Sequence, residues 1–152
     1  MKTIKKSILS VSVIICSLSL MSAGWGTDFA KAKEEAKMSN KYILLTFTGS
    51  DWCTPCMKTK KEIFQKESFT KFAEANLILV NADFPRLSKN KLSRVQVQKN
   101  EELAAQYDKE GVFPYIILLN PNGKILKEWR GYPDVKAEVF IAQIQEVERA
   151  NK

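Results

Sequence analysis

Cys53 and Cys56 are the residues of this chain whose type and spacing best suit chemistry, because two cysteines separated by two residues can close and reopen a disulfide. They belong to segment 52–56, which reads Trp-Cys-Thr-Pro-Cys. A disulfide that closes so short a loop removes little chain entropy and therefore stabilises a fold weakly. A structural disulfide and a zinc site are the alternatives, but zinc wants four ligands and the chain has no histidine. The pair therefore favours thiol–disulfide redox chemistry, and we expect no metal.

The elements around the two cysteines explain why the first should be reactive. Residues 42–48 (Tyr-Ile-Leu-Leu-Thr-Phe-Thr) form a nearly continuous apolar run, typical of a buried central strand, and residues 49–51 predict the turn after it. From Cys53 onward apolar residues recur at roughly helical spacing, and Pro55 suits the first turn of a helix. The helix dipole and free N–H groups stabilise a thiolate there, and cysteines in such motifs have pKa values lowered to roughly 3.5–7.5. We therefore expect an exposed Cys53 to attack and a less exposed Cys56 to resolve the mixed disulfide.

These features resemble the thioredoxin superfamily. The nearer resemblance is to its exported bacterial thioredoxin-like thiol:disulfide interchange proteins, whose active site begins Gly-Ser-Asp-Trp-Cys, as residues 49–53 do here. Residues 76–85 look like the family's next strand, and residues 111–123 resemble its cis-proline strand and hairpin turn. The resemblance covers about residues 41–132. It implies an α/β thioredoxin-like fold, with a central mixed sheet of about four strands and helices on both faces.

The same resemblance implies which residues bind the substrate. In family members the proline loop packs beside the two sulfurs, and its backbone pairs with the substrate chain. Carried over, Trp52 is an apolar platform beside the cysteines, Phe113 offers a strand-like backbone edge, and a cis Pro114 shapes the groove. No cofactor is implied other than the redox-active Cys53–Cys56 disulfide. The alternatives are a plain core aromatic at Trp52 and a trans proline that begins a buried strand at Pro114.

Two departures from the family pattern bear on mechanism. Many thioredoxins carry a buried aspartate six residues before the first cysteine, thought to move the proton of the second cysteine. Here that position is Phe47, while Asp51 is expected to be exposed in the turn, so water is the expected proton route. Thr54 and Pro55 place no charge beside the thiolate, and a proline there resembles reductase-type members more than strong oxidases. We therefore expect the protein to donate electrons.

The remaining segments alternate between helix and strand patterns, as an α/β fold requires. The predicted elements are a first helix over residues 29–36, a short helix over 68–76, a helix over 101–110 capped by Asn100, an edge strand over 124–130 and a final helix from Pro133.

The N-terminal residues carry the pattern of a secretory signal peptide. Three lysines in the first six residues precede an apolar, serine-rich run over residues 8–21, which is too short to span a membrane and is followed by small residues. We therefore divide the chain into a signal peptide, residues 1–24, and a single domain, residues 25–152. An uncleaved N-terminal anchor and a lipid on Cys16 are the alternatives.

The charge of the chain excludes one class of partner and leaves one segment to explain. With 24 Lys and Arg against 17 Asp and Glu, the net charge of +7 is too small to predict nucleic-acid binding. The stretch Arg86–Lys99 nevertheless holds five basic residues and no acidic one. It is either a solvated insertion or a docking surface for an acidic partner or for anionic membrane headgroups.

Two classes of function follow from these patterns. The first is a thiol:disulfide oxidoreductase, more a reductase than an oxidase, that acts on exported proteins through a Cys53/Cys56 dithiol and a mixed disulfide. The second is a thioredoxin-fold binding or chaperone module with idle cysteines; retention of both cysteines favours the first. The expected partners are thiols and disulfides of exported client proteins and a membrane electron donor. We expect a monomer in the periplasm of a Gram-negative bacterium.

Overall fold

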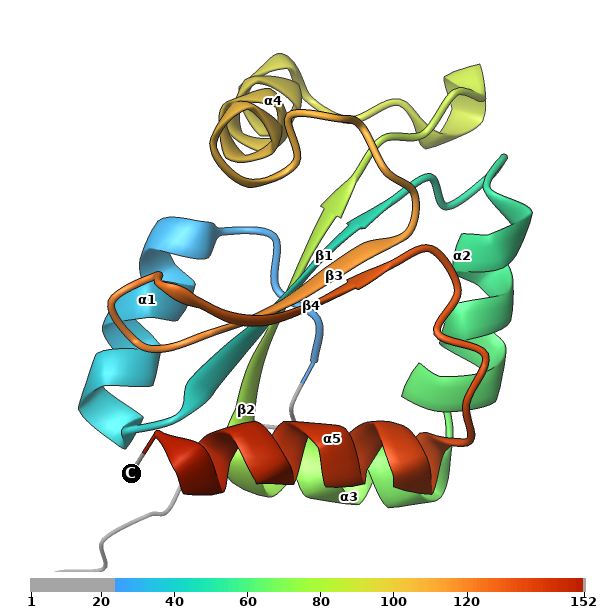
Figure 1. Ribbon diagram of the computed structural model, residues 1–152. Coiled ribbons are helices and arrows are strands. Elements are labelled where there is room, and N and C mark those ends of the chain that lie inside the picture. Colours follow the sequence, from blue (N-terminus) through green and yellow to red (C-terminus); the bar gives the residue numbers. More distant parts are fainter. Residues whose placement is uncertain (1–23, 152) are drawn as a thin grey trace, which may run out of the picture.

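The computed structural model describes residues 24–151, which are built around a four-stranded sheet (Figure 1). Its strands are β1 (Tyr42–Thr48), β2 (Leu77–Asp83), β3 (Tyr115–Leu119) and β4 (Ile125–Arg130), in the order β2-β1-β3-β4. β1 runs parallel to β2 and antiparallel to β3, which is antiparallel to β4. The predicted mixed sheet is confirmed, and the strand that leads into the cysteine motif is one of its two inner strands. Apart from Gly24, the predicted signal peptide lies outside the described residues.

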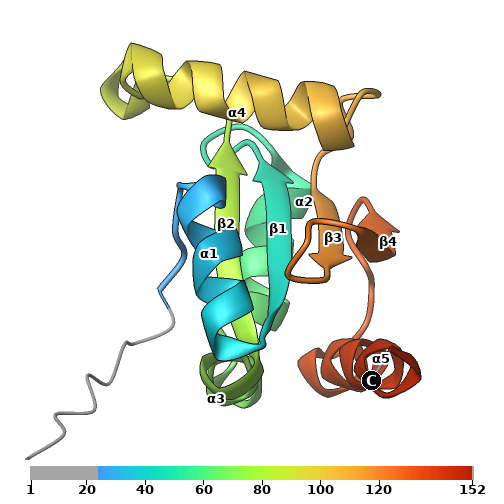
Figure 2. The same ribbon diagram turned by 90° about the vertical axis from the view of Figure 1, so that its left-hand side faces the viewer.

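Helices cover both faces of the sheet, as the two views in Figures 1 and 2 show. Helices α1 (Phe29–Ser39) and α4 (Arg94–Tyr107) pack on one face, and α3 (Glu67–Asn76) and α5 (Ala137–Ala150) on the other. The second face also carries α2 (Thr54–Thr59), which passes directly into a π-helical turn, η1 (Lys60–Phe64). A 3-10 turn, η2 (Ser88–Asn90), lies between β2 and α4. Among residues 24–151, none of the helices has the length and the apolar character that a membrane-spanning segment requires.

The core has two layers, one on each face of the sheet. Leu44 of β1 belongs to the layer beneath α3 and α5, whereas Ile43, Leu45 and Phe47 belong to the layer beneath α1 and α4. All four side chains are fully buried, because helices cover both faces of the strand. This double burial explains why residues 42–48 form a continuous apolar run rather than an alternating one.

The predicted helix over residues 101–110 is wrong at both ends. Helix α4 begins at Arg94, and the hydroxyl oxygen of Ser93 caps it by accepting the N–H of Gln96 (3.2 Å). The helix ends at Tyr107. The second half of the basic stretch is therefore helical rather than an irregular insertion.

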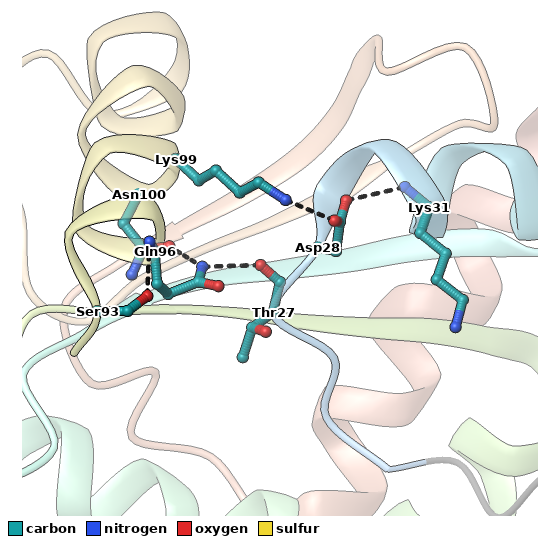
Figure 3. A network of polar contacts seen from close by, with 7 residues as sticks. All are labelled: Thr27, Asp28, Lys31, Ser93, Gln96, Lys99 and Asn100. Atoms are coloured by element: carbon teal, nitrogen blue, oxygen red, sulfur yellow. Dashed lines mark hydrogen bonds and ion pairs between the residues drawn. The ribbon is translucent and has the colours of Figure 1, made fainter.

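Asn100, the predicted cap, lies inside α4 and is buried. Its Nδ2 donates to the carbonyl oxygen of Asp83 (2.8 Å), and its Oδ1 accepts from Nε2 of Gln96 (2.8 Å). Gln96 in turn donates to the carbonyl oxygen of Thr27 (2.9 Å), as Figure 3 shows. An asparagine is tolerated in the helix interior here because partners outside its own turn satisfy its amide.

The final helix also begins later than predicted from Pro133. Asp134 has a φ of 49°, in the left-handed region, which a helix cannot contain. Helix α5 therefore starts at Ala137.

The residues just before α1 are attached to the outer edge of β2. The N–H of Gly26 donates to the carbonyl oxygen of Leu79, and the N–H of Asn81 donates to that of Gly26, both at 2.9 Å. Asp28 caps α1 and forms an ion pair with Lys99 of α4 (2.7 Å; Figure 3). The chain is thus fixed to the sheet from Gly26 onward.

Candidate active site

Cys53 and Cys56 form a disulfide at the start of α2, with their Cα atoms 5.2 Å apart. Cys53 is the N-cap residue of this helix, and its sulfur accepts the N–H of Cys56 (3.2 Å). Pro55 lies in the first turn, where its missing N–H costs no hydrogen bond. The predicted placement of the pair at a helix N-terminus is confirmed, and the N–H that points at the Cys53 sulfur is a donor suited to a thiolate.

The expected difference in exposure between the two cysteines is absent from the disulfide form. Cys53 is 3% exposed and Cys56 is 4% exposed. The prediction of an exposed Cys53 is therefore wrong for this form. The two sulfurs differ instead in their surroundings: that of Cys53 accepts an N–H at the helix end, whereas Cys56 lines a pocket beside the sheet. The preference for Cys53 as nucleophile consequently depends on the helix end rather than on access.

Trp52 is half-buried, and four neighbours hold its indole in place. Its Nε1 donates to the carbonyl oxygen of Phe84 (2.7 Å), and its ring meets that of Phe113 edge-on, with centroids 5.2 Å apart. A side chain at Gly49 would overlap the indole, so this glycine allows the ring to lie across the turn. On the solvent side, the guanidinium carbon of Arg86 lies 3.7 Å from the ring centroid. The structure thus brings Trp52 and Phe113 together beside the disulfide.

The Phe113–Pro114 peptide bond is cis, as the resemblance implied. Pro114 is buried and lines the same pocket as Cys56. The loop before the proline is held by Asp108, whose Oδ1 accepts the N–H of Val112 (3.0 Å). Burial raises the pKa of Asp108 above the ordinary aspartate value. The start of β3 is thereby positioned next to the cysteine pair.

A pocket of about 450 Å³ lies beside Cys56, between α2 and the sheet. On the sheet side it is lined by Thr46 and Thr48 of β1 and by Asn81 of β2. Both hydroxyls donate to Oδ1 of Asn81, at 3.0 Å from Thr46 and 2.7 Å from Thr48. The side of the sheet that faces Cys56 is therefore polar, with room for water.

Phe47 does not face this pocket. It is fully buried in the layer beneath α1 and α4, where it stacks with Tyr115 at a centroid distance of 6.0 Å. Successive residues of a strand point to opposite faces, so the neighbouring Thr46 takes the pocket side. Position 47, where many thioredoxins carry the aspartate, therefore lies away from Cys56 in this protein, and Thr46 and Thr48 line the pocket beside it. Two threonines in alternation within an apolar strand were the signal that could have indicated the polar side.

Asp83, at the end of β2, connects the pocket to the turn before the disulfide. Its carboxylate accepts the N–H of Ser50 (2.8 Å) and the hydroxyl of Ser50 (2.6 Å). The Thr48 hydroxyl is also within hydrogen-bonding distance of Asp83 Oδ1 (3.3 Å). Ser50 itself lines the pocket. Hydroxyl groups therefore lead continuously from the pocket beside Cys56 to a carboxylate.

Asp51 holds the loop after β2 against the active-site turn. Its carboxylate accepts the N–H of Arg86 (2.9 Å), the N–H of Leu87 (3.0 Å) and Nδ2 of Asn90 (2.9 Å). The N–H of Arg86 is the largest influence that lowers the pKa of Asp51 below the ordinary aspartate value. Asp51 is half-buried rather than exposed as expected, and its role is structural.

The chemistry available at this site is that of the cysteine pair. Among residues 24–151, no group of three or more His, Cys, Asp or Glu side chains could hold a metal ion. The disulfide can accept two electrons and two protons to become a dithiol, and the dithiol can return them to another disulfide.

Known proteins share this fold over most of the described residues. A family model described as a thioredoxin-like domain matches residues 29–148. The chain is 44% identical over 118 residues to the disulfide bond reductase DsbH of Chlamydia pneumoniae, an alignment that covers 78% of this chain and 69% of that protein. It is similar to the solved structure of a DsbH oxidoreductase, with a TM-score of 0.73, 34% identity and 94% of each chain covered. A thioredoxin from Thermus thermophilus has a TM-score of 0.60 at 18% identity, over 84% of this chain and 88% of its own, and shows likeness of fold.

Proposed function

The chain belongs to the thioredoxin-like family and is a thiol:disulfide oxidoreductase, and from this premise we propose that it reduces disulfides in exported proteins. The observation that carries the proposal is the Cys53–Cys56 disulfide at the start of α2, beside the cis proline Pro114. Electron transfer from this protein to its clients, rather than the reverse, is supported by the DsbH relative, which is named a disulfide bond reductase.

In the proposed reaction the reduced protein supplies both electrons. The Cys53 thiolate attacks one sulfur of a client disulfide, which forms a mixed disulfide and releases the other client sulfur as a thiolate. The Cys56 thiolate then attacks Cys53, which releases the second client sulfur and closes the Cys53–Cys56 disulfide. The client disulfide is reduced to two thiols, and this protein is oxidised by the same two electrons.

The second step requires Cys56 to lose its proton, and we propose that the pocket beside it provides the route. The Cys56 thiol gives its proton to water in the pocket, and the hydroxyls of Ser50 and Thr48 pass a proton on to Asp83. This assignment is supported by the 2.6 Å contact between the Ser50 hydroxyl and Asp83 and by the shared lining of the pocket. Phe47 takes no part, because it faces the other layer of the core.

The client chain is proposed to bind across Trp52, Phe113 and Pro114. An extended segment can pair with the backbone edge at Phe113, in the manner of an added strand, while its apolar side chains contact Phe113 and the part of Trp52 that Arg86 leaves uncovered. The 5.2 Å contact between the rings of Trp52 and Phe113 supports a single continuous binding surface.

The proposed direction of electron transfer is tested by measuring the reduction potential of the purified protein at equilibrium in glutathione redox buffers. Thr54 and Pro55 bring no charge, so the Cys53 thiolate is stabilised mainly by the helix end and by one N–H. We therefore expect a potential nearer to the value of about −270 mV for thioredoxin than to about −120 mV for a dedicated disulfide-forming oxidase. A protein with both cysteines changed to serine is the control and should show no transition. A potential close to that of the oxidase would reverse the assignment.

We also propose that the protein is exported to the periplasm of a Gram-negative bacterium, with residues 1–24 as a cleaved signal peptide and residues 25–152 as a single thioredoxin-like domain. The hydrogen bonds that join Gly26 to the edge of β2 support a domain that includes the residues from about 25 onward. In an oxidising compartment the dithiol must be regenerated, and a membrane electron donor fits this need. Client proteins are the other proposed partners; we propose neither nucleic-acid binding nor stable self-association.

Intact-mass measurement of the protein recovered from the periplasm tests the export proposal. We expect a mass that corresponds to a chain beginning at Gly24 or Trp25. A mass that retains Met1 would indicate an uncleaved anchor, and a lipid on Cys16 would indicate a lipoprotein; either result contradicts the proposal.

A further inference from the structure

An exposed arginine lies stacked on the tryptophan next to the disulfide. The guanidinium carbon of Arg86 is 3.7 Å from the centroid of the Trp52 ring. The indole cannot turn freely, because Nε1 donates to the carbonyl oxygen of Phe84 (2.7 Å) and the ring packs edge-on against Phe113. A cation on the face of a fixed aromatic ring occupies a defined place, so the charge of Arg86 is held beside the cysteine motif.

The rest of the loop is fixed at the same end of the sheet. Asp51, in the turn before the cysteines, accepts from the N–H of Arg86 and from Nδ2 of Asn90 (both 2.9 Å). Lys89 and Lys91 flank Asn90 in the sequence and are exposed. Figure 1 shows this turn, in yellow-green, at the same end of the molecule as the start of α2. We call Arg86, Lys89 and Lys91 the basic rim.

The charge of the basic rim is available to a partner. Within residues 24–151, none of its three side chains forms an ion pair with a carboxylate, whereas Lys99, further along the same basic stretch, is paired with Asp28. The Asp51 carboxylate accepts from two backbone N–H groups and one amide of the loop, and from none of the three basic side chains of the rim. The arrangement therefore presents positive charge outward.

Exposed apolar side chains accompany the basic rim. Leu87, in the same loop, is 48% exposed, and Met57, in α2 one residue after Cys56, is 44% exposed. Protein interfaces combine apolar contact with a polar or charged edge, and methionine suits surfaces that bind several partners. The surface around the disulfide thus has both components.

We propose that the basic rim is a docking surface for acidic segments that flank the target cysteine of a client protein. This proposal deepens the proposed reductase function and rests on it. Arg86 of the rim is stacked on Trp52, and Asn90, between the two lysines, is bonded to Asp51 in the turn before the cysteines, so the rim lies where a client must approach for its sulfur to reach Cys53. A surface for anionic lipid has no need of that position.

Two physical effects follow from a docking surface of this kind. Opposite charges raise the rate of encounter, so the preference for acidic clients should appear in the second-order rate constant. Because the rim is exposed, salt should remove the preference: the Debye length falls from about 30 Å at about 10 mM salt to about 3 Å at about 1 M.

The test uses three disulfide peptides that differ only in the residues beside the cysteine, which are acidic, neutral or basic. The rate at which each peptide oxidises the reduced mature protein is followed by stopped-flow fluorescence. At about 10 mM salt we expect the acidic peptide to react about tenfold faster than the neutral one, and the ratio to fall to about twofold or less at about 1 M. Changing all three residues of the rim to glutamine should reduce the low-salt ratio to about twofold as well. Arg86→Lys, which keeps the charge, should retain most of the preference.

A control variant removes three positive charges outside the rim: Lys37→Gln, Lys71→Gln and Arg149→Gln, which lie in α1, α3 and α5. This variant has the same net charge as the rim variant and should keep the tenfold ratio. An unchanged ratio in the rim variant, or an equal loss in the control, overturns the proposal. The proposal is also overturned if the wild type reacts equally with the three peptides and binds vesicles of anionic lipid that the rim variant does not bind. The rim would then bind a membrane. The neutral peptide reports on the proposed function separately: if it is not reduced, both proposals fail, whereas reduction without charge preference leaves the reductase function standing.

Discussion

A Cys56→Ser variant of this protein is expected to lose at least about a thousandfold of its multiple-turnover activity and to accumulate as mixed disulfides through Cys53. Cys53 lies at the helix end and its sulfur accepts the N–H of residue 56, an interaction that a serine at that position leaves intact. Attack on the client therefore continues. The serine hydroxyl cannot displace the client from Cys53, so the reaction stops at the mixed disulfide. Non-reducing electrophoresis of periplasmic extracts, followed by mass spectrometry, identifies the trapped clients.

Two controls accompany this variant. Cys53→Ser should lose activity to the same extent but trap no client, and the variant with both cysteines changed should do neither. All three should remain folded by circular dichroism, because a disulfide that spans two residues contributes little to stability. Clients trapped on Cys56 in the Cys53→Ser variant would show that the roles of the two sulfurs are reversed.

An Asp83→Asn variant is expected to resolve the mixed disulfide about tenfold more slowly than the wild type near pH 6.5. Asparagine preserves the shape of the side chain and can still accept the N–H of Ser50, but it cannot take up a proton from the Ser50 hydroxyl. An ordinary thiol ionises near pH 8.5, so at higher pH Cys56 loses its proton without help. The defect should therefore be largest below about pH 7.5 and should disappear above about pH 9. Single-turnover release of a chromogenic thiol measures the step directly.

Asp134→Asn is a suitable control for this experiment. Asp134 is exposed and has a φ of 49°, a conformation that asparagine adopts readily, and it does not line the pocket beside Cys56. This variant should match the wild type at every pH. If Asp83→Asn slows the reaction equally at every pH, then Asp83 only supports the turn at Ser50 and the proposed proton route is wrong.

The predicted start of the helix at residue 101 was wrong because the side chain of Asn100 bonds to other parts of the structure instead of capping a helix. Asn100 has the chemistry of a helix cap, but contacts with Asp83 and Gln96 satisfy it within α4, and Ser93 caps the helix instead. Local pattern cannot distinguish these outcomes, because the same amide serves either role. The final helix begins after the predicted position because Asp134 has a left-handed backbone conformation. The backbone conformation of a single residue depends on its surroundings as well as on its type, so the sequence alone does not predict it.

The sequence by itself determined the chemistry and the order of the elements. A cysteine pair with two intervening residues, a proline in the first helical turn and a preceding apolar strand are local features, and each predicts its own structure through spacing alone. The strand over residues 42–48 and the helix that opens at Cys53 are therefore found where the pattern placed them, and the cis Pro114 is found where the family resemblance implied it. The family resemblance added the sheet that joins them, which the structure confirms.

Only the tertiary structure decided what surrounds the two sulfurs. Both faces of β1 are buried, so its apolar residues do not show which side of the strand faces Cys56. Alternating threonines mark one side as polar, but only the packing of the helices places Thr46 at the pocket beside Cys56 and Phe47 in the opposite layer. The stacking of Arg86 on Trp52 likewise depends on two loops far apart in the sequence, which meet because β1 and β2 are parallel neighbours that end at the same edge. Contacts of this kind have no local signature, because they are set by how the strands pair and not by the residues on either side in the chain.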